Sequence, residues 1–500
     1  YIPLVSLSLL GLSSCDKFLD ELPDNRTEID TVEEVQELLV SAYPNGLYMD
    51  IAETMSDNAS DKVTLPESSP LNTDLYTWRG SNETTRDTPV FYWTAAYNAI
   101  ASANQALASL EQMKGGNAQK FLKGEALVAR AYAHFMLAYL WCKPFNPATA
   151  ATDLGLPYVD KPETVVFGKY KRISLEAFYN AIEKDLNEGL PLIDNTKYSK
   201  PKFHFTKEAA HAFATRFYLY KGDWDKVIEH ADVISGSNPQ SKLRNEKVQQ
   251  KSLTALQKRE QNSSSAEVSN LLIAGVLSQY QFRQTSNKYG MTYDLMNNQI
   301  INARTHPLNL SWAYTVYGAT VNNQNLLKFQ PYYTEMNVSA GTGIPHTMVT
   351  LLSYDEVILN RMEAYLMKNE YTKFLDDLKV FLPVKTEADF NTSSLTESVI
   401  ETKYNGKGTD LDPAYTLNSR QRVWLACLLD LRRVQFAFEG LRWFDNKRLG
   451  MTITHLKDGA TIELPKNDPR RELQLPDYAI KQGLTANRSE EHTSELQSLR

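Results

Sequence analysis

Apolar residues recur every three or four positions over long stretches of the chain, the spacing that places them on one face of an α-helix. The clearest case covers 96–110, and the same spacing returns over 122–140. Between these two stretches, Gly115, Gly116 and Asn117 form a turn signal. The pattern therefore predicts two amphipathic helices joined as a helical hairpin.

Two later stretches repeat this hairpin pattern. The first begins at Thr206, a side chain suited to a helix N-cap, and carries Gly222 and Trp224 between its helices. The second carries Asn369 and Tyr371 at the equivalent places. Glycine, or next best asparagine, permits the left-handed backbone of a tight turn, and we expect the aromatic residue to fill the wedge between the helices. The pattern resembles the turn and second helix of a tetratricopeptide repeat.

These hairpins do not follow one another at a constant period. Trp224 and Tyr371 are 371 − 224 = 147 residues apart, whereas tetratricopeptide repeats recur about every 34 residues. A last strongly periodic stretch covers about 421–439. We therefore predict a mainly α fold, in which tetratricopeptide-like helical hairpins form a single α-helical domain with long loop insertions and minor β structure. The polar stretches 237–270 and 297–330 are the largest insertions, and there we expect the binding surface.

The first residues have the pattern of an export signal. Residues 2–12 are apolar apart from two serines, which is too short to span a bilayer but suits a secretory signal. Ser13 and Ser14 then precede Cys15, and the chain turns polar at Asp16. This order resembles the bacterial lipobox, so we expect 1–14 to be part of a signal peptide and Cys15 to be lipidated. The alternative is a buried N-terminal helix with a chance cysteine.

The other end of the chain lacks helical periodicity. Residues 488–500 are polar and look like translated adapter sequence. We expect them to be an artefactual or disordered tail, and we assign them no function.

Composition excludes several classes of protein. The chain has 53 basic and 60 acidic residues, a net charge of −7, which argues against a nucleic-acid partner. Its three cysteines, at 15, 142 and 427, form no pair suited to a zinc site or a disulfide framework. We therefore expect neither a metal site nor a cofactor.

The sequence contains no recognisable catalytic motif. GxSxG, HExxH, Walker A and GxGxxG patterns are all missing. Adjacent acids such as Asp376 and Asp377 point to different sides of a helix and suit a paired glycosidase site poorly. We expect Glu439 to form scaffold ion pairs with Arg432 and Arg442. The prediction is a protein with no catalytic residues, not an enzyme.

Aromatic residues outside the hairpins are the first candidates for ligand binding. Tyr76, Trp78 and Arg79 lie together in a stretch rich in Asn, Thr and Asp, and Trp312 and Tyr314 lie in an insertion. Flat aromatic rings stack on the apolar faces of sugars, while polar side chains bind the hydroxyl groups. The alternative is that these aromatic residues pack beneath long loops.

Several blocks of the chain, in order, resemble the SusD/RagB family. The strongest block runs from Arg432 to Arg448 (RRVQFAFEGLRWFDNKR). Gln435 and Asn446 depart from it, because the family usually has an acid at the first position and an apolar residue at the second. The other blocks are the lipobox with Phe18-Leu19-Asp20, Ser56-Asp57-Asn58, Tyr97-Asn98-Ala99-Ile100, Gly124-Glu125-Ala126 with Ala129-Arg130-Ala131-Tyr132, and Glu356-Val357-Ile358-Leu359-Asn360-Arg361.

This resemblance implies a cell-surface lipoprotein of the Bacteroidota outer membrane. Such proteins capture an oligosaccharide, or in some members an oligopeptide, and deliver it to a TonB-dependent transporter of the SusC type. It also implies that 15–487 is one SusD-like helical-repeat domain, and that Asp57 and Asn58 lie near the ligand. A surface glycoside hydrolase and a scaffold that only gates the transporter lid are the alternatives.

Overall fold

The computed structural model of the protein describes residues 29–113, 116, 119–163, 168–320 and 323–488. The expected signal segment 1–14, the lipidation site at Cys15, and all of the expected tail except Arg488 lie outside these ranges. Arg488 itself is buried, and its guanidinium donates to the backbone oxygens of Arg470 (3.3 Å) and Glu472 (3.0 Å). This residue therefore packs with the folded body.

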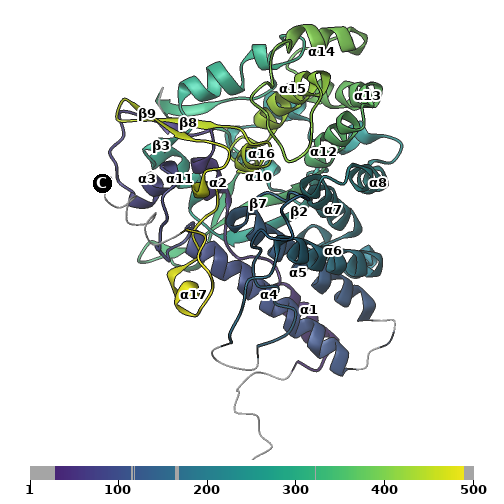
Figure 1. Cartoon of the computed structure of the whole chain (residues 1–500), viewed down its shortest axis with the longest axis vertical. Helices are drawn as coiled ribbons and strands as arrows, with labels where there is room; N and C mark the ends of the chain where they lie inside the picture. The colour runs from purple at the N-terminus through teal and green to yellow at the C-terminus, as the bar shows by residue number, and fades with distance from the viewer. Residues whose placement is uncertain (1–28, 114–115, 117–118, 164–167, 321–322, 489–500) are drawn as a thin grey trace, which may run out of the picture.

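The predicted mainly α architecture is confirmed. Helical hairpins stack side by side along the right-hand side of Figure 1, from α4 and α5 at the lower end to α13 near the top. In this stack α4 packs on α5, α5 on α6, α7 on α8, and α12 on α7, α8, α13 and α15, and the apolar faces that they bury form one continuous core. The stack consists of α4 (Pro89–Gln112), α5 (Lys120–Trp141), α6 (Leu175–Gly189), α7 (Lys207–Lys221), α8 (Trp224–Ser235), α12 (Tyr354–Met367), α13 (Tyr371–Phe381) and α15 (Ser419–Gln435).

Local signals explain where these helices begin and turn. The Thr206 side chain accepts a hydrogen bond from Ala209 N, which confirms the predicted N-cap. Gly222 (φ 78°) and Asn369 (φ 60°) are both left-handed, as predicted for the two turns. The helix predicted over 96–110 starts earlier, at Pro89, because Thr88 caps it and proline is favoured at the first helical position.

The last periodic stretch is two helices rather than one. Predicted over 421–439, it ends as α15 at Gln435, and the chain then turns through Phe438 (φ 72°) and Gly440 (φ 73°) into α16 (Leu441–Arg448). The apolar spacing continues through the turn because Phe436 and Phe438 are both buried. Periodicity alone therefore missed this break.

The β structure is minor, as predicted, and most of it lies between α8 and α12. A three-stranded antiparallel sheet has the order β2 (Asn270–Leu277), β7 (Thr342–Ser353), β6 (Gln330–Asn337). These strands flank the two predicted polar insertions rather than lying within them. Smaller antiparallel pairs join β1 (Ser60–Asp61) to β3 (Tyr289–Gly290), β4 (Tyr317–Thr320) to β5 (Asn323–Asn325), and β8 (Ile453–Lys457) to β9 (Ala460–Leu464).

Short helices complete the fold outside the stack. α1 (Val32–Leu39) lies beside α4 at the lower end of Figure 1. The others are α2 (Met49–Met55), α3 (Pro70–Tyr76), α9 (Glu246–Ser252), α10 (Ala255–Asn262), α11 (Tyr280–Ser286), α14 (Glu397–Lys403) and α17 (Asp477–Lys481). Within the described ranges, no helix is both long and apolar enough to cross a membrane.

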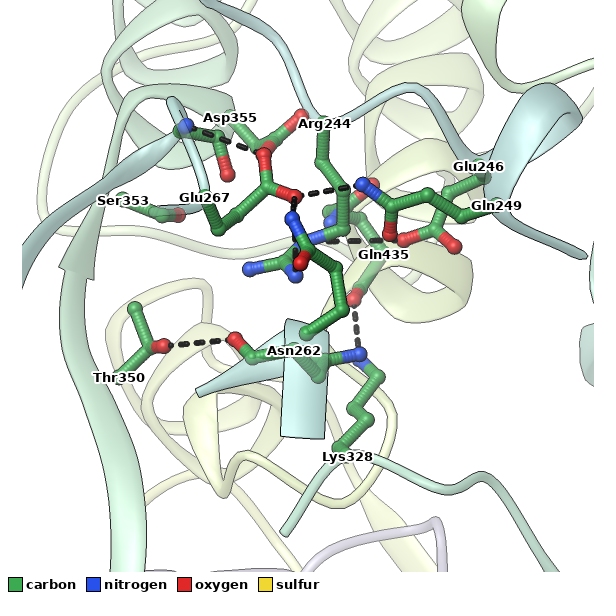
Figure 2. Close-up of polar contacts among 12 residues, drawn as sticks. Arg244, Glu246, Gln249, Asn262, Glu267, Lys328, Thr350, Ser353, Asp355 and Gln435 are labelled. Carbon is green, nitrogen blue, oxygen red and sulfur yellow. Dashed lines mark hydrogen bonds and ion pairs between the residues drawn. The ribbon is translucent and has the colours of Figure 1, made fainter. Parts of the chain in front are cut away.

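A buried polar cluster joins the segment between α8 and α12 to the helical stack (Figure 2). The Arg244 guanidinium donates to Asn270 Oδ1 (2.6 Å) and lies 3.9 Å from the Glu267 carboxylate. Lys328 donates to the backbone oxygen of Gln435 at the end of α15 (2.6 Å) and to Glu439 (2.7 Å). Because buried charges are costly without partners, these contacts fix where the sheet sits on the helices.

Acid should weaken the fold through His134. Its Nδ1 lies 2.9 Å from the Arg130 oxygen and its Nε2 lies 3.1 Å from Val159 N, which fits a neutral ring that donates through Nδ1 and accepts through Nε2. Burial lowers the pKa of His134 from 6.5 to about 3. Between these values the unfolded chain binds the proton and the folded chain does not. The free energy of unfolding should therefore fall as the pH falls, by about 1.4 kcal/mol per pH unit from this residue.

Urea unfolding of the wild type and of His134→Gln between pH 7 and 4.5 tests this expectation. The variant should be less stable at pH 7 but should lose less stability toward pH 4.5. Equal pH slopes in the two proteins would contradict the assignment.

Candidate ligand-binding site

Asp57 and Asn58 form hydrogen bonds with two arginines of the block 432–448, which carries the strongest family resemblance. Asp57 accepts two hydrogen bonds from the Arg442 guanidinium, each 2.7 Å long. Asn58 Oδ1 accepts one from Arg433 Nε (2.8 Å). Burial alone would raise the pKa of Asp57, but Arg442 and Arg433 hold it well below its ordinary value. These contacts join the first part of the chain to the last, 385 positions away.

The ion pairs expected within this block are different in the structure. Arg442 pairs with Asp57, and Arg432 pairs with Asp445 (2.8 Å). Glu439 pairs with Lys328 (2.7 Å). The expectation that Glu439 would hold both arginines was wrong, because the left-handed turn at Phe438–Gly440 separates them.

Glu53 of α2 holds that left-handed turn. Its carboxylate accepts hydrogen bonds from Phe438 N (2.8 Å), Gly440 N (3.0 Å) and Asn58 Nδ2 (3.0 Å). Burial raises the pKa of Glu53 to about 7, and these three donors oppose the shift. A Cβ at position 440 would lie 3.0 Å from the Cβ of Ala52, so only glycine allows α2 to approach so closely.

Tyr76 and Trp78 lie inside the protein. Tyr76 is 0 % exposed and Trp78 is 1 % exposed, and both stack on His455 of β8 at 4.0 and 4.6 Å between ring centroids. Trp78 Nε1 donates to the backbone oxygen of Met55 (2.8 Å). Arg79 pairs with Asp74 (3.0 Å). The structure brings these residues together, but in this conformation neither ring offers a face to a ligand.

Trp312 and Tyr314 lie apart from that group, beside the end of α15. Trp312 is 4 % exposed and donates from Nε1 to Thr305 Oγ1 (2.8 Å). Tyr314 is half-buried, and its hydroxyl donates to Gln435 Oε1 (3.0 Å). Gln435, where the family usually has an acid, thus has a neutral hydroxyl as its partner. The ligand-binding roles of the predicted residues stay predictions, and most of these side chains are buried in this conformation.

A hollow of about 690 Å³ lies between α4 and the three-stranded sheet; we call it the first hollow. Its volume falls within the range of about 300–1,000 Å³ that is usual for ligand pockets. Its aromatic lining is Tyr43, Phe91, Phe203 and Tyr332, and its polar lining is Ser41, Asn45, Thr94, Asn98 and Ser102. None of the described residues that line it is charged.

Tyr332 lies across the sheet at the wall of the first hollow. It is paired with His346 across the strands, and the two rings are stacked with centroids 5.0 Å apart. Its hydroxyl reaches over Gly275 of β2, where any Cβ would collide with it. Gly275 is therefore required for this close approach, and the ring is held by the strands on which it rests.

A second hollow, of about 480 Å³, lies on the other flank of α4. Helix α17, residues 157–163 and Tyr170 form most of its other walls. Its aromatic lining is Trp93, Tyr97, Tyr170 and Tyr478, and Lys161 and Glu163 are its charged residues. Tyr478 is 44 % exposed, so part of its ring is free.

Asn98 and Ser102 line both hollows. They are one turn apart on α4, and both are at least partly exposed. Asn98 makes no side-chain hydrogen bond within the described part of the chain, so its amide is free for a ligand. Together the two hollows offer aromatic walls with neutral hydrogen-bonding groups between them, the combination that binds sugars.

Few features of the amino-acid sequence indicate these hollows. Tyr332 belongs to a strand without regular alternation of apolar and polar residues, and Asn98 lies within a helix predicted as scaffold. One available signal was the glycine in a strand, Gly275, because glycine there often marks a close approach. Among the described residues, no group of three or more His, Cys, Asp or Glu side chains could hold a metal ion.

Loss of the Asp57 carboxylate should destabilise the fold rather than change ligand affinity. Asp57→Ala leaves two poorly exposed guanidinium groups without their partner, which should cost on the order of 3 kcal/mol. Thermal unfolding measures this loss. Asp389→Ala is the control, because that side chain is fully exposed and its ion pair contributes little. A stable Asp57→Ala protein that had lost ligand affinity would restore a binding role for Asp57.

Comparison with known proteins gives a family match over the first part of the chain and a shared fold over most of it. Residues 17–219 match the SusD-like family described as starch-binding and associating with the outer membrane. No curated protein sequence matches the chain.

Solved structures with the same fold come from Bacteroides. A SusD superfamily protein from Bacteroides thetaiotaomicron has a TM-score of 0.63 at 16% identity and covers 92% of this chain and 100% of its own. A SusD superfamily protein from Bacteroides vulgatus has a TM-score of 0.65 at 17% identity, over 91% and 98%. A SusD-like carbohydrate-binding protein from Bacteroides vulgatus has a TM-score of 0.62 at 16% identity, over 90% and 96%.

The first part of the chain matches this family, and a fold that covers 91–92% of the chain is shared with these solved structures. Residues 17–219 therefore resemble the SusD-like family, and most of the chain has the same fold as these SusD superfamily proteins.

Proposed function

We propose that this protein is a lipid-anchored protein of the outer-membrane surface that captures an oligosaccharide and delivers it to a SusC-type, TonB-dependent transporter. It binds its ligand without cleaving it. The match of residues 17–219 to a family described as starch-binding and associating with the outer membrane supports this role. Cys15, within its lipobox-like sequence, is the proposed site of the anchor.

The single observation that carries the binding function is the first hollow. Its uncharged, largely aromatic and aliphatic lining suits a neutral ligand with apolar faces, and its Ser, Thr and Asn side chains suit hydroxyl groups. A peptide would bring a charged end or a row of amide groups that need partners, and the lining supplies few. An oligosaccharide therefore fits this hollow better than an oligopeptide.

Tyr332 is the ring that we propose to stack on a sugar. The sheet fixes its position before the ligand arrives, so little conformational entropy is lost on binding. The lining of the first hollow contains no pair of carboxylates placed to cleave a glycosidic bond.

Tyr332→Ala should weaken oligosaccharide binding about tenfold, a change of about 1.4 kcal/mol, because it removes a stacking face. Isothermal titration calorimetry against a panel of glycans and peptides measures the affinity. Tyr333→Ala is the matched control, since Tyr333 is the next residue of the same strand, is 47 % exposed and does not line the hollow.

Equal affinities of the Tyr332→Ala and Tyr333→Ala proteins would exclude the first hollow as the site. Binding of peptides but not glycans would reverse the choice of ligand. Release of shorter sugars from any glycan during the titration would contradict the proposal that the protein has no catalytic activity.

A further inference from the structure

We infer that the two hollows bind one extended ligand, which crosses α4 over Asn98 and Ser102 and occupies both hollows at once. This inference rests on the proposed function and adds to it a requirement for chain length. The ligand class is a linear oligosaccharide of several units rather than a single sugar or a disaccharide.

The two hollows meet on α4. The first hollow takes its α4 lining from the flank that carries Phe91 and Ala95, and the second from the flank that carries Tyr97 and Ala101. Asn98 and Ser102 lie between these flanks and belong to both linings. The two hollows are thus the two ends of one path over a single helix.

The width of α4 sets a minimum length for a ligand that occupies both hollows. An α-helix with its side chains is about 10–12 Å wide, so a ligand that reaches from one flank to the other must be at least about that long. A single sugar ring cannot fill both hollows. A linear oligosaccharide can place one ring in each hollow while its middle lies over the helix.

The part of the path that crosses α4 is polar, and the two ends of the path are aromatic. Asn98 is exposed with a free amide, and Ser102 donates only to the Asn98 backbone oxygen (3.1 Å). Tyr332 lies at one end of the path and Tyr478 at the other. The Tyr478 hydroxyl is 3.3 Å from Thr94 Oγ1, a residue that lines the first hollow, so the two ends are also linked across α4.

The path is rigid because an anchored helix, α4, lies at its centre. α4 is anchored at its start by the Thr88 cap and along its length by buried residues on its other faces. Loops form only part of the walls, at 40–45, around Phe203, at 157–163 and at Tyr170. Because a helix at the centre fixes the spacing of the two hollows, the site selects ligands by their length and does not adapt to shorter ones.

Affinity as a function of chain length tests the inference. The probes are linear glucose oligosaccharides of two to eight units with α-1,4, β-1,4 or β-1,3 linkages, titrated into the full-length protein by calorimetry. Within the series that binds, affinity should rise about tenfold or more from the shortest to the longest chain and then level off. Equal affinity at every length would overturn the inference and leave the proposed function standing, whereas no binding in any series would overturn both.

Variants at each end of the path distinguish one continuous binding site from two independent sites. Tyr332→Ala and Tyr478→Ala should each lower the affinity for the longest chain to about that of a short chain. Tyr293→Ala is the control for Tyr478, because it is similarly exposed (47 %) and lines neither hollow. A binding stoichiometry of two long chains per protein, each lost with only one variant, would overturn the inference.

Blocking the crossing is the sharpest test. Asn98→Trp places a large side chain between the hollows and should weaken long chains about tenfold while short chains bind as before. Gln112→Trp, at the exposed end of the same helix, is the matched control. Both proteins should unfold at the same temperature as the wild type; an Asn98→Trp protein that binds long chains normally would overturn the inference.

Discussion

The fold depends on how Glu53 holds the left-handed turn between α15 and α16. A buried carboxylate is tolerated only when donors surround it, and here two of the three donors are backbone N–H groups of that turn. The turn must contain a residue without a Cβ, because Gly440 touches α2 at Ala52 and Met49. The hydrogen bonds and the close packing therefore select the same geometry, and that geometry directs Arg442 to Asp57.

This contact joins two segments that are far apart in sequence, since α2 comes near the start of the chain and α16 near its end. The strain of two left-handed residues, one of them the bulky Phe438, is offset by the contacts that the turn makes. Polar clusters recur where segments distant in sequence meet: Arg244 with Asn270, Lys328 with Glu439, and Asp57 with Arg442. Helix packing supplies the core, and these buried polar contacts determine which surfaces meet.

The candidate site follows from that arrangement. Lys328, which precedes β6, joins the sheet to Gln435 and Glu439 at the end of α15, and the sheet borders α4 across the first hollow. Tyr332 can lie flat because Gly275 has no side chain, and α4 separates two hollows whose linings share Asn98 and Ser102. The walls are thus mainly regular elements, which hold a ligand site more accurately than loops do.

The sequence alone determined the local features of this protein, because they depend on neighbours within a few positions. The helical hairpins, the Thr206 cap and the left-handed turns at Gly222 and Asn369 all follow from spacing and from the backbone preferences of single residues. The resemblance of several blocks to the SusD/RagB family likewise came from the sequence; residues 17–219 match the SusD-like family, and the fold is shared with SusD superfamily structures.

Only the tertiary structure decided which aromatic rings are free. Trp78 and Tyr332 both occur in polar surroundings along the chain, yet His455, 377 positions away, covers Trp78, while Tyr332 lines a hollow. The same holds for the partners of Arg442 and for the break after Gln435, since both depend on α2. Burial and pairing are set by contacts between distant segments, and hydrophobic periodicity within one segment carries no information about them.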